Sequence, residues 1–64
     1  MSSERLLLRV EEAADRLAIG RSKTYELIRQ GILPSVRLGR TVRVPLYALE
    51  HWIAEELERQ RSAE

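Results

Sequence analysis

Hydrophobic positions near the start of this 64-residue chain follow the spacing of an amphipathic helix. Three leucines followed by Arg9 favour a short extended segment at residues 6–9, and from residue 10 the pattern repeats every three or four positions. The apolar members of this repeat are Ala13, Ala14, Leu17 and Ala18. Acidic residues at the start of the repeat suit the positive end of a helix dipole. The pattern therefore predicts a first helix that begins at residue 10.

A second helical pattern follows almost at once. Gly20 interrupts the first pattern and offers a permissive backbone for a turn or a helix cap. The residues of the next helix that are expected to turn inward are Thr24, Leu27 and Ile28. Gly31 is a typical C-terminal stop, and Pro34 prevents the helix from continuing. The sequence therefore predicts two short helices joined by a tight turn, with the small Ala14 where the helices cross.

Residues 36–44 change to the period of a β-strand. The alternating apolar positions are Val36, Leu38, Val42 and Val44, and the polar positions between them include Arg37 and Arg43. Residues 38–41 form a tight-turn signal around Gly39. We therefore expect a small β-hairpin with one apolar face and one cationic face.

A final helix is expected after the hairpin, because Pro45 suits the first turn of a helix. Its predicted buried stripe comprises Leu46, Leu49, Trp52, Ile53 and Leu57. The position of Trp52 on this stripe favours a core residue over an interface anchor. The chain is thus predicted to form one mainly α-helical domain with a small β-hairpin, with loose ends at 1–5 and 60–64.

Charge is strongly polarised along the chain, although the net charge is only +1. Residues 21–45 carry six basic residues and one acidic residue, for a net charge of +5. The flanking segments are acidic, at −1 for residues 1–20 and −3 for residues 46–64. Ten of the eleven basic residues are arginine, whose planar fork suits phosphates and guanine edges. This asymmetry indicates an anionic partner.

Composition argues against several other classes of protein. The chain has no cysteine, which excludes disulfides and thiolate metal sites and suits a reducing cytoplasm. Its longest apolar run, residues 6–8, is too short for a membrane span. His51 is the sole histidine, so neither a metal site nor a catalytic dyad is expected. We therefore expect no enzyme, no cofactor, no membrane association and no small-molecule substrate.

The outward side chains of the second helix are candidates for DNA contact, because an α-helix fits the major groove of B-DNA. These candidates are Arg21, Ser22, Lys23, Tyr25, Glu26 and Arg29. The alternative is an ordinary helical hairpin with a solvated charged face. Glu26 could accept a hydrogen bond from a cytosine amino group, but we favour a local pair with Arg29, three positions later.

The predicted hairpin adds a second set of candidate DNA contacts, formed by Arg37, Gly39, Arg40, Thr41 and Arg43. A basic hairpin next to a recognition helix has the arrangement of a wing, which grips phosphates or a neighbouring minor groove. The alternative is a strand edge that charge protects against aggregation. We favour the wing, since all these charges have one sign. Together the segments predict a winged helix-turn-helix.

The run LLRVEEAADRLAIGRSKTYELIRQGILPSVRLGRTVRVPLYALEHWI resembles the excisionase-type DNA-binding domain of phages and other mobile elements. That domain is a compact relative of the MerR-type winged helix, and the resemblance covers roughly residues 7–57. It implies a recombination directionality factor. Such proteins bind attachment-site DNA as adjacent copies, bend it, and favour excision with a tyrosine or serine integrase.

Carried over by position, the resemblance assigns the polar start of the recognition helix to residues 21–23. Tyr25 matches the aromatic position that is frequent in the family, and Gly39 with Arg40 matches the wing tip. Two positions depart from the family. Gly20 replaces a usual Ser or Thr cap, and Glu26 stands where a basic residue is common.

The expected partners are double-stranded DNA, a phage integrase and further copies of the chain, in the cytoplasm and nucleoid of a bacterial host. One alternative is a small transcriptional regulator of a prophage or plasmid. Another is a protein-interaction adaptor that uses the final helix.

The acidic residues of that helix are Glu55, Glu56 and Glu58. We favour a solvated face for them over contact with the basic wing of a neighbouring copy. Tyr47 could lie at the core rim or donate to a phosphate.

Overall fold

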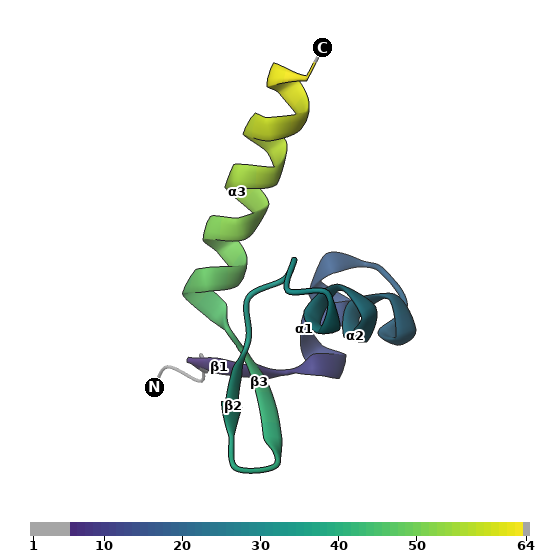
Figure 1. Ribbon diagram of the computed structural model, residues 1–64, viewed down its shortest axis with the longest axis vertical. Helices are drawn as coiled ribbons and strands as arrows, with labels where there is room; N and C mark the ends of the chain where they lie inside the picture. Colours follow the sequence, from purple (N-terminus) through teal and green to yellow (C-terminus); the bar gives the residue numbers. More distant parts are fainter. Residues whose placement is uncertain (1–5, 64) are drawn as a thin grey trace.

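The computed structural model describes residues 6–63 and has the predicted order of helix, turn, helix, hairpin and helix (Figure 1). The elements are β1 (Leu7–Arg9), α1 (Val10–Leu17), α2 (Arg21–Arg29), β2 (Val36–Leu38), β3 (Thr41–Pro45) and α3 (Leu46–Ser62). The fold class predicted from the sequence, a mainly α-helical winged helix-turn-helix, is confirmed. Residues 1–5 and 64, for which we expected loose ends, lie outside the described residues.

The extended segment before α1 joins the hairpin in one antiparallel sheet. The strand order is β1-β3-β2, so β3 is the central strand of three. Leu8 pairs with Val44, and Arg9 pairs with Arg43. The backbone N–H of Leu46 also donates to the carbonyl oxygen of Leu6 at 2.9 Å. The N-terminal strand is therefore fixed against the base of the hairpin, close to the point where α3 begins.

The core lies between the sheet and the helices. Its buried cluster consists of Leu8, Ala13, Leu33, Val44, Leu46 and Leu49, with Leu17, Leu27, Ile28 and Trp52 half-buried around it. Ala14 is buried as predicted, and Thr24 is fully buried on the inner side of α2. Burial of apolar surface is the main stabilising term for so small a domain. This core fixes the orientation of α2 and of the hairpin.

The turn between α1 and α2 depends on Ala18 rather than on Gly20. Ala18 has a φ of 59°, whereas Gly20 has an ordinary extended backbone (φ −69°, ψ 157°) and caps α2. The N–H of Ile19 donates to the carbonyl oxygen of Ala14, and that of Ala18 to the carbonyl oxygen of Asp15, both at 3.1 Å. This pair of bonds is the Schellman arrangement, which places a left-handed residue just after the helix. The predicted helix therefore ends at Leu17, one residue early.

The end of α2 uses the same arrangement with the expected glycine. Gly31 has a φ of 76°. Its N–H donates to the carbonyl oxygen of Ile28 at 3.0 Å, and the N–H of Ile32 donates to that of Leu27 at 2.9 Å. Gly31 tolerates this left-handed backbone because it has no Cβ atom. The predicted stop at Gly31 is confirmed.

Helix α3 is buried only over its first two turns. Leu46 and Leu49 are buried and Trp52 is half-buried, but Ile53 is 44% and Leu57 59% exposed. The predicted buried stripe is therefore wrong beyond Trp52, because α3 extends past the small sheet and the other helices (Figure 1). The helix also continues through residues 60–62, where we expected a loose end. Within residues 6–63, no helix is long and apolar enough to cross a bilayer.

Candidate nucleic-acid interface

The register of the hairpin is set by a turn of two residues, Gly39 and Arg40. Gly39 has a φ of 66°, which favours glycine at this position. Leu38 pairs with Thr41, Val36 with Arg43, and Arg37 with Val42. Directly paired residues on neighbouring strands share one face of a sheet. The turn therefore places an apolar residue opposite a cationic one in two successive pairs, Arg37 with Val42 and Val36 with Arg43.

The prediction of one apolar and one cationic face is consequently wrong. Arg37 shares its face with Val42, whereas Arg43 lies on the other face beside Val36. Val36 and Leu38 are 36% and 57% exposed rather than buried. Shifting a register by one residue exchanges the faces of a whole strand, and the two-residue turn fixes that choice. Arg37 and Arg43 thus point to opposite sides of the sheet.

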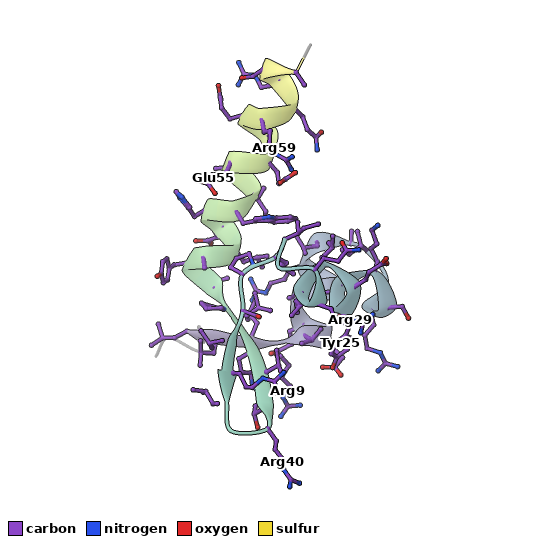
Figure 2. The ribbon with its side chains drawn as sticks, in the orientation of Figure 1. Arg9, Tyr25, Arg29, Arg40, Glu55 and Arg59 are labelled. Atoms are coloured by element: carbon purple, nitrogen blue, oxygen red, sulfur yellow. The ribbon has the colours of Figure 1, made fainter. Side chains whose placement is uncertain are left out.

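Helix α2, the hairpin and the start of α1 border an open groove of about 390 Å³. The predicted site residues that line it are Tyr25, Arg40, Thr41 and Arg43, and the other lining residues are Arg9, Val10, Glu11 and Val42. Tyr25 is supplied by the exposed side of α2, and Arg40 by the tip of the hairpin (Figure 2). The structure therefore brings residues from the predicted recognition helix and the predicted wing to one surface.

Arg21 lies at the edge of this groove. Its Nη1 atom is 3.9 Å from Oε2 of Glu11, and both side chains are more than half exposed. An exposed ion pair of this length contributes little to stability, and both side chains can reorient. Ser22 and Lys23 follow in the first turn of α2 and are also exposed. The predicted start of the recognition helix is thus accessible to solvent next to the groove.

The rest of the outer face of α2 is exposed as well. Tyr25 is 40% exposed, and Glu26 and Arg29 are also exposed. Arg29 lies one turn beyond Tyr25 on α2 (Figure 2). Among the residues that the structure describes, Glu26 forms no ion pair with Arg29, so the local pair that we favoured from the sequence is not present. Exposed pairs at this spacing are worth only a few tenths of a kcal/mol, roughly 0.2–0.5, and need not form.

Arg9 is the cationic groove residue that the sequence did not indicate. The sequence predicts an extended segment at residues 6–9, but the position of Arg9 beside the wing depends on the pairing of β1 with β3. Alternation with the buried Leu8 would have placed Arg9 on an outer face, and nothing in the sequence specified its neighbour across the sheet. A contact between residues 9 and 43 is non-local, and strand pairing at such separation is not encoded in periodicity.

The charged side chains of α3 lie away from the groove. His51 Nε2 is 3.2 Å from Oε2 of Glu55, Glu56 contacts Arg59, and Arg61 Nη1 is 4.0 Å from Oε1 of Glu58. Glu55 and Arg59 are on the helix that projects from the end opposite to the hairpin tip (Figure 2). Within the described part of the chain, no three His, Asp or Glu side chains gather in a way that could hold a metal ion.

Residues 7–57 match the model of a helix-turn-helix domain family. The chain belongs to this helix-turn-helix family. It is 46% identical over 59 residues to a protein of Saccharopolyspora erythraea named probable excisionase, covering 92% of this chain and 60% of that protein. It is 43% identical over 51 residues to an excisionase of Streptomyces ambofaciens, covering 80% of this chain and 82% of that protein.

These similarities confirm the resemblance to excisionase-type helix-turn-helix proteins. The matched region spans β1 through the first part of α3, so it contains all the residues that line the groove. The chain spans only about three fifths of the length of the Saccharopolyspora relative. No solved structure matches the chain at a significant level.

Proposed function

We propose that this protein binds double-stranded DNA as an excisionase, with α2 in a major groove and the β2–β3 hairpin on the adjacent backbone or minor groove. The observation that carries the proposal is the groove in which Tyr25 of α2 meets Arg40 and Arg43 of the hairpin. An α-helix fits the major groove of B-DNA, which is about 12 Å wide. A protruding basic hairpin beside it can then reach phosphates.

The charge on α2 supports an anionic partner at its N-terminal end. Helix α1 has Glu11 and Glu12 in its first turn, which suits the helix dipole. Helix α2 instead begins with Arg21 and Lys23 and has no acidic residue in its first turn. Cations at this end are unfavourable in the free protein, whereas a DNA phosphate complements both them and the unpaired N–H groups.

The proposed contacts divide by role. Arg21, Ser22, Tyr25, Glu26 and Arg29 read base edges from α2, while Lys23 contacts the backbone. Gly39, Arg40, Thr41 and Arg43 hold the backbone or the minor groove from the hairpin. Arg37 reaches the DNA from the other face of the sheet. Phosphate contacts give most of the affinity, and base contacts give the specificity.

We propose an architectural role for the bound protein. Two relatives are named as excisionases, so the protein would act on attachment-site DNA of a mobile element in a bacterial cytoplasm. It would bend this DNA and direct an integrase toward excision without chemistry of its own. A single module with about six cationic contacts binds with modest affinity and steep salt dependence, so several adjacent copies would be needed.

Charge along the chain supports contact between such copies. Residues 21–45 carry +5 and residues 46–64 carry −3. The acidic part of α3 also exposes Ile53 and Leu57. On adjacent DNA sites, α3 of one copy would pack against the next copy and cover these exposed apolar side chains, which replaces the solvated face that the sequence alone favoured.

A recombination assay tests this function. Excision of a substrate with both attachment sites should rise when the protein is added to the cognate integrase, and no recombination should occur with the protein alone. Footprinting of the same sites should show adjacent protected segments. A transcriptional regulator of the same fold would instead protect a promoter and leave excision unchanged, and an adaptor would protect no DNA.

A further inference from the structure

Arg9 faces Arg43 across the sheet, and both residues line the groove. The register of β1 and β3 makes them direct cross-strand partners. Like charges in this position repel and destabilise a sheet. Arg9 is exposed and Arg43 is half-buried, so solvent screens the repulsion only in part. The free protein therefore carries an unfavourable cationic pair on the surface proposed for DNA.

No carboxylate of residues 6–63 forms an ion pair with either guanidinium group. The Nη1 atom of Arg43 donates to the carbonyl oxygen of Val42 at 3.0 Å, which leaves its charge uncompensated. Glu12 accepts a hydrogen bond from the backbone N–H of Arg9 at 2.9 Å. Glu11 also lines the groove, but it lies 3.9 Å from Arg21.

The backbone of Arg9 is held in place on both sides. Its neighbour Leu8 is buried in the core, and α1 begins at the next residue, Val10. The bond from its N–H to Glu12 fixes the junction between β1 and α1. A side chain that projects from such a fixed backbone loses less conformational freedom when it binds a ligand.

We infer that Arg9 and Arg43 together hold one backbone phosphate of the DNA, so that β1 is a third DNA-binding element beside α2 and the hairpin. This inference rests on the proposed function. A phosphate has several acceptor oxygens, and two guanidinium forks can donate to it from adjacent strands. Its negative charge removes the repulsion between the two cations. The contact is independent of base sequence, since it involves only the backbone.

Substitution of Arg9 with Gln should therefore have two opposite effects. Binding to a fluorescently labelled duplex of arbitrary sequence weakens, and the salt dependence becomes shallower by one phosphate contact. Between 50 and 200 mM salt, the wild-type protein should lose about three- to fourfold more affinity than the Arg9→Gln variant. The melting temperature of the free variant should rise by about 1–4 °C because the repulsion is gone.

Arg16→Gln is a matched control, since Arg16 is an exposed arginine of α1 that does not line the groove. This variant should keep the salt slope of the wild type, and its melting temperature should not rise. Arg9→Lys should keep the salt slope, because the charge remains. In an Arg43→Gln background, the stabilisation from Arg9→Gln should disappear, since the repelling partner is absent.

An unchanged salt slope for Arg9→Gln, in a protein whose wild type binds the duplex, would overturn this inference and leave the proposed function standing. A fall in both affinity and melting temperature would also overturn it, because it would assign Arg9 a structural role. Absence of binding by the wild-type protein would overturn the proposed function and this inference together.

Discussion

The Oγ1 atom of Thr24 donates a hydrogen bond to the carbonyl oxygen of Gly20 at 2.9 Å, across the first turn of α2. Thr24 is the fully buried polar residue on the inner face of this helix. The same carbonyl accepts the backbone N–H of Thr24 at 3.1 Å. Two bonds therefore join Thr24 to the N-cap residue of α2 and hold the first turn of the helix on the buried side.

Thr24→Val should lower the free energy of unfolding by about 0.5–1.5 kcal/mol, since it removes the hydroxyl bond but keeps the volume. Urea denaturation followed by circular dichroism measures this change. Thr41→Val is the control, because Thr41 is exposed at the tip of the hairpin and should change stability by less than about 0.5 kcal/mol. Equal effects of the two substitutions would show that the buried bond is not stabilising.

Ala18→Gly should raise the free energy of unfolding by about 1 kcal/mol, because Ala18 adopts a left-handed backbone that costs less for glycine. Thermal or urea unfolding tests the sign. The same substitution at Ala54, an exposed position inside α3, should lower stability by about 1 kcal/mol. If both substitutions were destabilising, the left-handed turn between α1 and α2 would be in doubt.

The sequence was sufficient to predict the helices and the ends of α2. Gly31 and the inward Thr24 follow from local rules, which involve residues a few positions apart. The hairpin faces could not be predicted in the same way, because they depend on whether the turn holds two residues. The pairing of Arg9 with Arg43 joins distant segments, so no local pattern records it.

The exposed end of α3 illustrates a different limit. The spacing of Leu49, Ile53 and Leu57 is helical throughout, and it correctly predicts a helix. Periodicity does not reveal where the packing partner ends, and here the sheet covers only the first turns of α3. Ile53 and Leu57 belong to the helical apolar pattern but remain exposed to solvent in a single copy of the protein.

Arg21→Ala should reduce discrimination between a cognate site and an unrelated duplex by about 1–3 kcal/mol, if Arg21 makes a bidentate base contact. Arg40→Ala should weaken binding to every duplex and reduce the salt slope by about one. Gel shifts over a range of salt concentrations separate the two results. Arg59→Ala on α3 is the control for loss of a charge. Equal losses on all sequences for Arg21→Ala would remove it as a base reader.

Leu57→Ser should leave the stability of the single copy within about 0.5 kcal/mol, because Leu57 is 59% exposed. Cooperative occupancy of adjacent DNA sites should fall, whereas binding to an isolated site should persist. Footprint titrations on both kinds of DNA measure this difference. The buried Leu49 gives the contrast, since Leu49→Ala should cost about 2–5 kcal/mol of stability. Unchanged cooperativity in Leu57→Ser would exclude this end of α3 from contacts between copies.

The most direct test of the DNA-binding surface is the change in backbone amide NMR signals when duplex DNA is added to the isotope-labelled protein. We expect the largest changes at residues 9–11, 21–29 and 39–43, which combine the start of α1, the outer face of α2 and the hairpin tip. The signals of residues 53–62 should change little on a duplex that accommodates one copy. Changes confined to α3, with none in the groove, would contradict the account.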